Sequence, residues 1–220
     1  LQPLKAMDYK QATTYMQLVN DDICALPEFT GVAVRLGKPV PEIIIGTLYD
    51  DRQVDEEVRE YCRIAKVLHS LKNAKLGHIG HPLNSMMDMN TDPTMLTAFF
   101  GSHVISYEPN ELLKQMENVS DREVKEKEAC ILDFFDTPDP VSDPISMKLR
   151  DEDLKVAAKV SLALDKFVDS NGLNGLAYYY DGADNSSIRQ LMSNLIVGNS
   201  LLTARHIPMC GESDLSLIHI

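Results

Sequence analysis

The chain has 220 residues, of which 33 are acidic and 21 basic, so its formal net charge is −12. Its 44% of apolar residues is too high for a disordered chain and is enough for the core of one large or two small domains. The acidic balance argues against nucleic acid as a partner, because a phosphate-binding surface needs a basic stripe. No uncharged apolar run is long enough for a transmembrane helix.

The regular part of the chain begins with a short β-branched run at residues 43–48, which predicts a buried strand. Asp50 and Asp51 follow as candidate helix N-caps. Apolar residues then recur at helical spacing from Val54 to Leu68. This segment therefore predicts an amphipathic helix.

Strand and helix signals alternate along the rest of the chain. Strand composition is found at residues 74–80, 103–107, 175–180 and 207–210. Helix caps or helical periodicity are found at residues 93–100, 108–118, 151–170 and 188–196, and at a capping box that begins at Ser120. We expect Asp184 or Asn185 to cap the helix of residues 188–196, and the proline-rich residues 133–147 to form a loop. The alternation predicts an α/β fold, a doubly wound, mostly parallel, Rossmann-like sheet with helices on both faces.

The four cysteines, Cys24, Cys62, Cys130 and Cys210, lie far apart and form no CxxC pair. A zinc ribbon, a thioredoxin-like site and a disulfide framework are therefore unsupported. We expect four reduced, mostly buried thiols in a cytoplasmic protein. The chain also lacks a GxGxxG phosphate loop and a GxSxG nucleophile turn, which removes support for a nucleotide site and for a serine hydrolase.

In a parallel α/β sheet, ligands bind beyond the carboxyl ends of the strands. The loops expected there are residues 80–84, 108–111, 181–185 and 211–214. They carry several acidic residues, which suit a divalent cation and acid–base chemistry. Of the local pair His78 and His81, we interpret His78 as a structural residue of the strand and His81 as the functional candidate.

Two acidic turns are the strongest candidates for chemistry. Asp181 follows three tyrosines; it either caps the next helix or points into a site, where the helix dipole would keep it ionised. Glu212 follows Gly211, which allows a sharp turn that projects the carboxylate across the edge of the sheet. The alternative for that segment is a simple capping turn.

These motifs together resemble the L-arabinose isomerase and L-fucose isomerase-like family. The resemblance is carried by residues 175–181, 196–202 and 207–214, with support from residues 30–35 and 77–81, and it spans nearly the whole chain. The resemblance to this family implies that the protein is an aldose–ketose isomerase. A divalent metal, usually Mn²⁺, would hold two adjacent oxygens of a small sugar, and two carboxylates would move a proton through an enediol.

By position, the resemblance implies that Asp181 and Glu212 are both metal ligands and catalytic residues, and that His81 and Leu83 bind the substrate. It also implies a homo-oligomeric parent with sites shared between subunits. Asp181 is one methylene shorter than the expected Glu. The family's two downstream histidines do not follow Glu212 here, and we do not treat His219 as one of them. We therefore expect the fragment alone to have no isomerase activity.

For the domains, we expect residues 1–38 to enter from a missing N-terminal domain, residues 39–215 to form a central α/β domain, and residues 216–220 to be a non-native tail. A second functional hypothesis is a non-catalytic sugar-binding or regulatory α/β module, which the shorter Asp181 favours. A response-regulator-like domain is disfavoured, because no acidic cluster at a first strand end pairs with a lysine at the edge of the sheet.

Overall fold

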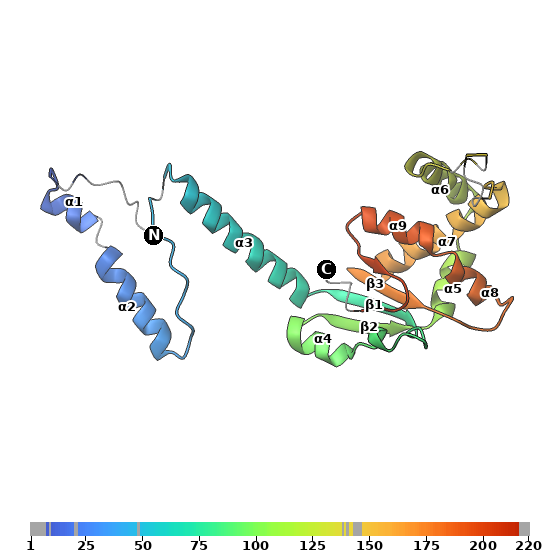
Figure 1. Cartoon of the computed structure of the whole chain (residues 1–220), viewed down its shortest axis with the longest axis horizontal. Coiled ribbons are helices and arrows are strands. Elements are labelled where there is room, and N and C mark those ends of the chain that lie inside the picture. Colours follow the sequence, from blue (N-terminus) through green and yellow to red (C-terminus); the bar gives the residue numbers. More distant parts are fainter. Residues whose placement is uncertain are drawn as a thin grey trace. The chain divides into compact units, whose positions relative to one another are not determined.

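A four-stranded parallel sheet organises the later part of the chain (Figure 1). Its strands are β1 (Lys75–Gly80), β2 (His103–Tyr107), β3 (Gly175–Tyr179) and β4 (Met209–Cys210), in the order β2-β1-β3-β4. The computed structural model describes residue 8 and residues 10–19, 22–47, 49–137, 139, 141–142 and 147–215. The predicted tail at residues 216–220, with His219, lies outside these residues.

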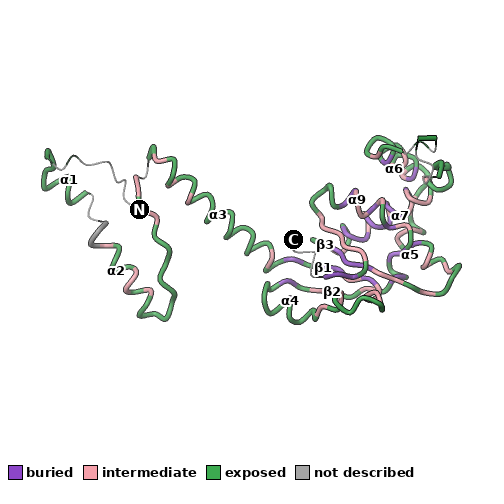
Figure 2. Tube along the Cα trace, in the orientation of Figure 1, coloured by how far each residue is buried: buried purple, intermediate pink, exposed green. Residues whose placement is uncertain are grey.

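The chain divides into two compact units, Leu1–Leu68 and His69–Ile220. The first unit holds α1 (Thr14–Val19), α2 (Asp22–Arg35) and most of α3 (Arg52–Lys72). Among the residues of this unit whose exposure is described, none is buried (Figure 2). The buried core of the described chain therefore belongs to the second unit.

Helices cover both faces of the sheet, so the predicted α/β fold class is confirmed. On one face, Ile79 and Tyr178 pack in a single core with α5 (Pro109–Glu117), α7 (Asp151–Asn171), α8 (Ser187–Ser193) and α9 (Ile196–Ala204). On the other face, Leu76 and Ala177 pack with Leu96 of α4 (Pro93–Phe100). The remaining helix, α6 (Asp121–Phe134), packs against α7, and a short 3-10 turn lies at Met87–Met89.

Local caps explain where several helices begin and end. Asp92 accepts a hydrogen bond from the Thr94 amide at 2.8 Å and starts α4. Ser120 and Glu123 form the predicted capping box of α6. Gly172, with φ of 61°, ends α7 in the left-handed conformation that glycine adopts without strain. These three signals were all readable in the sequence.

The predicted strand at residues 43–48 is wrong. Residues 43–47 form no strand, Ile45 is 82% exposed, and Leu48 lies outside the described residues. A β-branched run becomes a strand only where a neighbouring backbone completes its hydrogen bonds. In the described part of the chain, no strand pairs with this segment. Asp51, in contrast, caps α3 as expected, since its side chain accepts a hydrogen bond from the Val54 amide.

The helix predicted at residues 188–196 is two helices, α8 and α9. Ser193 and Asn194 turn their side chains back onto backbone carbonyls of α8, which competes with continuation of the helix. The cap of α8 is Ser186, whose hydroxyl accepts a hydrogen bond from the Arg189 amide at 3.1 Å, and not Asp184 or Asn185 as expected.

The expectation of mostly buried thiols is also wrong for the described cysteines. Cys62 and Cys130 are exposed, and Cys210 is half-buried. Cys62 lies on α3, which has no buried residue. In the described part of the chain, no helix combines the length and the apolar character needed to cross a bilayer.

Candidate functional site

The strand order places a winding reversal between β1 and β3. From β1 the chain passes through α4 on one face to reach β2, and then through helices on the opposite face to reach β3. Because all four strands are parallel, their carboxyl ends meet at one edge, as expected, and we call it the carboxyl edge. Ligands of such sheets bind in the crevice at this reversal. The geometry therefore directs attention to the residues that follow β1 and β3.

His81 follows β1 and lies against β3. Its amide donates to the Tyr179 carbonyl at 3.1 Å, and its ring meets the Tyr179 ring edge-on at 5.7 Å. His81 Nδ1 is 2.8 Å from the Pro82 carbonyl oxygen, which can only accept, so Nδ1 carries the proton. In the neutral ring, Nε2 is then the acceptor. Leu83, the other predicted substrate contact, is half-buried in the same loop.

Gly80 makes this close approach possible. Its φ is +84°, and a Cβ atom at this position would lie 1.9 Å from the Tyr179 carbonyl oxygen. Since that oxygen belongs to the backbone of β3, it cannot turn aside. Glycine is therefore required where the chain leaves β1.

Ser213 joins the loops after β1 and β4. Its hydroxyl donates to the His81 carbonyl at 3.0 Å, and its amide donates to the Tyr178 carbonyl at 3.2 Å. The side chain is 1% exposed. Glu212 and Ser213 both have positive φ values, 58° and 63°, which are uncommon for residues other than glycine. Such backbone conformations persist where surrounding contacts hold them, and they cluster at functional sites.

Glu212 itself is exposed at the carboxyl edge, next to the buried Ser213. The turn that follows Gly211 therefore leaves this carboxylate open to solvent. The hydrogen bonds of Ser213 fix the backbone beneath it.

Asp181 lies at the end of β3 in an ion pair with Arg189 of α8. Arg189 Nη1 contacts Asp181 Oδ1 and also donates to the Gly182 carbonyl at 3.1 Å. Arg189 Nε lies 3.5 Å from Asp184 Oδ1. The Asp181 carboxylate raises the pKa of Arg189 above its ordinary value. Asp181 therefore faces a fixed positive charge of the chain itself.

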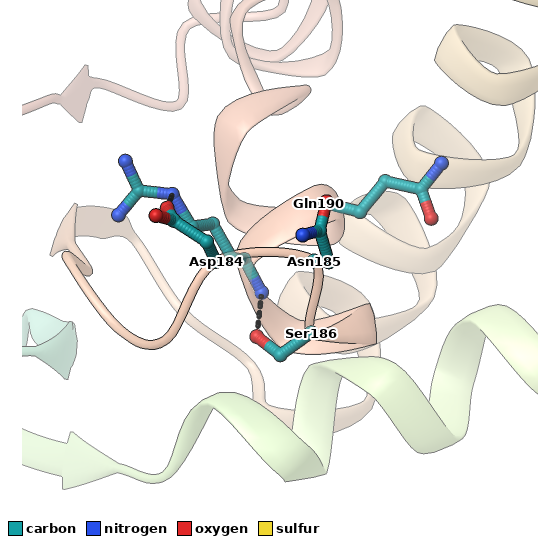
Figure 3. Close-up of a pocket in the computed structure, with 5 residues that line it drawn as sticks. Asp184, Asn185, Ser186 and Gln190 are labelled. Atoms are coloured by element: carbon teal, nitrogen blue, oxygen red, sulfur yellow. Dashed lines mark hydrogen bonds and ion pairs between the residues drawn. The ribbon is translucent and has the colours of Figure 1, made fainter.

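Arg189 also lines an open hollow of about 630 Å³. Figure 3 draws the residues that line it. Its lining is polar: Asp184, Asn185, Ser186, Arg189 and Gln190. These residues belong to the loop after β3 and to the start of α8, so the hollow belongs to the carboxyl edge.

His78 occupies β1 beside Ala177 and Ser106 of the neighbouring strands. Burial lowers its pKa, and the nearby His81 lowers it further; its Nε2 is buried without a hydrogen-bond partner.

Cys210 lies on β4, and burial raises the pKa of its thiol, with a further contribution from Asp214.

The ligand set expected for a metal is not complete in the described residues. Among them, no three His, Cys, Asp or Glu side chains lie close enough to hold an ion. Asp181 is paired with a guanidinium, and Glu212 faces solvent. These residues do not fit a resident metal by themselves.

The chain is similar to L-arabinose isomerases from three organisms. That of Bifidobacterium adolescentis is 26% identical over 145 residues, which cover 66% of this chain and 27% of that protein. That of Flavobacterium johnsoniae is 23% identical over 145 residues, 66% of this chain and 28% of that protein. That of Nocardioides sp. is 23% identical over 164 residues, which cover 74% of this chain and 31% of that protein.

The chain resembles L-arabinose isomerase. This similarity confirms the resemblance expected from the motifs, and it is distant and partial. The chain spans about three tenths of the length of the curated relatives it matches. No protein-family profile matches it.

Arg189 and Ser213 are the residues of the carboxyl edge that the motifs did not reveal. Arg189 is the sole Lys or Arg between residues 167 and 204, and this isolation was a readable signal. Ser213 stood inside the acidic turn, but its bonds join three segments distant in the sequence. No local pattern identifies such a role.

Proposed function

We propose that the chain is the central α/β portion of an arabinose or fucose isomerase-like protein and that its carboxyl edge contributes part of a sugar site. The observation that carries the proposal is the similarity to L-arabinose isomerases over 66–74% of the chain. The winding reversal at the carboxyl edge supports the placement of the site, because it lies where sheets of this type bind ligands.

In this proposal, residues that follow β1 and β4 contact a small sugar. His81 presents Nε2, an acceptor for a sugar hydroxyl, beside the half-buried Leu83. Glu212 presents a solvent-facing carboxylate that can accept and return a proton between neighbouring sugar carbons, the transfer that an enediol pathway requires. Asp181 is the second carboxylate that the resemblance implies.

The metal that the resemblance implies, Mn²⁺, needs ligands beyond these two carboxylates. The proposal therefore includes a parent protein in which other regions or neighbouring subunits complete the site. As the resemblance implies, that parent would be a homo-oligomer, and the scattered cysteines, which form no CxxC pair, favour the cytoplasm.

A second function is favoured by one observation, the ion pair of Asp181 with Arg189. In this pair the Asp181 carboxylate is engaged by a side chain of the same protein and not by a substrate or a metal. The chain would then be a non-catalytic sugar-binding or regulatory module that uses the same edge.

Saturation-transfer NMR tests sugar binding by the purified chain, with L-arabinose, L-ribulose and L-fucose as probes and sucrose as the control sugar. We expect transfer to at least one of the three probes. His81→Ala and Glu212→Ala should reduce the signal, while Glu152→Ala, which removes an exposed acid from the first turn of α7, should not.

Isomerase assays of the parent protein with and without Mn²⁺ separate the two functions. Turnover that is lost in Glu212→Ala supports the isomerase. Binding without turnover supports the non-catalytic module. Absence of transfer to all three probes, or equal effects of Glu212→Ala and Glu152→Ala, overturns the placement of a sugar at the carboxyl edge.

A further inference from the structure

Arg189 gathers three oxygen atoms of the loop that follows β3. Its guanidinium contacts Asp181 Oδ1, the Gly182 carbonyl oxygen at 3.1 Å and Asp184 Oδ1 at 3.5 Å. Two of these oxygens are carboxylate and one is carbonyl, the donor types that hard divalent cations prefer. In this chain, the positive charge that contacts these oxygens is the Arg189 guanidinium.

The backbone of Arg189 is held at the start of α8. The Arg189 amide donates to Ser186 Oγ at 3.1 Å, which ties the residue to the start of α8, and the Arg189 carbonyl accepts from Ser193 Oγ at 2.8 Å. Arginine offers a rigid, planar fork of donors and stays charged at all relevant pH values. The backbone of Arg189 is therefore fixed at the start of α8, and its half-buried guanidinium reaches the loop from there.

The loop itself is tightly built around this contact. A Cβ atom at Gly182 would lie 2.1 Å from the Tyr180 hydroxyl, so the tyrosine ring lies directly over the loop backbone. Asn185 completes the turn with a φ of 61°. Without the guanidinium, the carboxylates of Asp181 and Asp184, which are 55% and 86% exposed, would lie beside this turn with no countercharge from Arg189.

We infer that Arg189 takes the place of a cation beside Asp181 and shapes the loop, so that Asp181 is not a metal ligand in this chain. The inference differs from the role that the sequence implied for Asp181. It concerns only the charge that holds the loop and does not require that a sugar binds.

A consequence follows for variants that lack the guanidinium. Removal of Arg189 leaves two carboxylates and a carbonyl oxygen, which had contacted Nη1 and Nε of one guanidinium, without that positive partner. Such a set should gain affinity for a divalent cation, whereas the unmodified chain should bind it only weakly.

Mn²⁺ titration by calorimetry tests this with five proteins: the unmodified chain, Arg189→Gln, Asp181→Asn, the double variant Asp181→Asn/Arg189→Gln, and Lys155→Gln. The last removes one positive charge from an exposed position on α7 and is the matched control. We expect Arg189→Gln to bind Mn²⁺ at least tenfold more tightly than the unmodified chain. The double variant should lose this gain, and Lys155→Gln should show none.

Hydrogen exchange of residues 181–186 gives a readout that needs no activity. Arg189→Gln should speed exchange of this loop, and Mn²⁺ should slow it again in that variant alone. An affinity gain no larger than that of Lys155→Gln overturns the inference. So does tight Mn²⁺ binding by the unmodified chain that Asp181→Asn abolishes.

If Arg189→Gln does not fold, NMR of the Arg189 Nε–H group in the unmodified chain decides the question. We expect its resonance to stay in place as Mg²⁺ is added, because the cation does not displace the guanidinium. A resonance that moves or broadens in step with Mg²⁺ binding contradicts the inference. None of these three experiments uses a sugar, so a failure here is distinct from a failure of the proposed function.

Discussion

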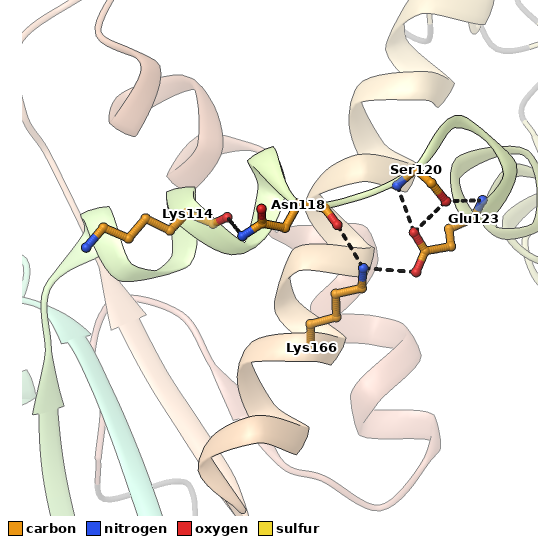
Figure 4. Close-up of polar contacts among 5 residues, drawn as sticks. All are labelled: Lys114, Asn118, Ser120, Glu123 and Lys166. Atoms are coloured by element: carbon orange, nitrogen blue, oxygen red, sulfur yellow. Dashed lines mark hydrogen bonds and ion pairs between the residues drawn. The ribbon is translucent and has the colours of Figure 1, made fainter.

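Glu123 shows how one side chain can make folding depend on pH. Its carboxylate accepts hydrogen bonds from the hydroxyl and the amide of Ser120, both at 2.7 Å, and an ion pair from Lys166 Nζ at 2.9 Å (Figure 4). The Ser120 bonds, followed by Lys166, lower the pKa of Glu123 from 4.5 to about 2. Lys166 also donates to the Asn118 carbonyl, so the group joins α7 to the start of α6.

A pKa that is lower in the folded protein means that the ionised carboxylate favours folding. The contribution of Glu123 is complete above pH 4.5, shrinks as the pH falls, and is lost below about pH 2. Glu123→Gln should therefore flatten the fall in unfolding free energy over this range. Urea denaturation at several pH values measures it, with the exposed Glu117→Gln as the control that should keep the unmodified slope.

Gly80 gives a second prediction at the residue scale. Gly80→Ala combines a left-handed backbone with a Cβ atom 1.9 Å from a carbonyl oxygen, so we expect a loss of about 3 kcal/mol of unfolding free energy. Gly172→Ala has a similar φ of 61° but open space around it, and should cost about 1 kcal/mol. Denaturant unfolding compares the two; equal losses would contradict the close approach of β1 and β3.

Local signals predicted residues whose partners are near in sequence. The caps at Asp92 and Ser120 each engage an amide two or three residues away, so spacing alone identifies them. The contact of Asp181 with Arg189 depends on the path of the loop between them, and the bond of Ser213 to His81 spans 132 positions. The strand ends predicted that these residues lie at the carboxyl edge, but not which of them pair with one another.

The same distinction holds for whole elements. Residues 43–48 are the more apolar and β-branched of two predicted strands, yet only the other, at residues 74–80, is a strand, because β2 and β3 complete its backbone hydrogen bonds. The apolar periodicity from Ile188 to Ile196 continues through a break that Asn194 causes with its side chain. Periodicity indicates which face of an element is apolar. Whether a strand forms depends on neighbouring strands that complete its backbone hydrogen bonds, and a helix can end where side chains compete for its backbone carbonyls.

Asp165 of α7 connects three helical segments. It accepts from Lys127 of α6 at 2.5 Å and from Arg205, at the end of α9, at 3.1 Å, and its side chain is 16% exposed. Asp165→Asn would leave the mostly buried Lys127 ammonium without its countercharge. We therefore expect a loss of about 2 kcal/mol of unfolding free energy.

Asp169 provides the matched control for this prediction. It lies one turn along α7, contacts Arg205 at 3.8 Å, and is 64% exposed. Asp169→Asn should change the unfolding free energy by less than about 0.5 kcal/mol, because exposed ion pairs contribute little. Similar losses of unfolding free energy in the two variants would show that burial does not strengthen the ion pairs of Asp165.

At the scale of the whole molecule, the two units differ in how they bury apolar side chains. The second unit places the sheet between helices, with a core that includes Ile79, Leu176 and Phe167. In the first unit, α3 keeps its apolar residues accessible: Tyr61 is 45% exposed and Leu68 61%. Exposed apolar area of this kind marks a surface that contributes little to stability by itself.

Two helices of equal length allow a direct comparison of these units. Both α3 and α7 contain 21 residues, but α7 has seven buried residues and α3 has none. Most helical stability in proteins comes from packing of an apolar face, so α3 should open with a free energy below about 2 kcal/mol while α7 opens only with the core. Hydrogen exchange followed by mass spectrometry should therefore label α3 long before α7. Protection of α3 equal to that of α7 would show that its apolar face is covered in solution.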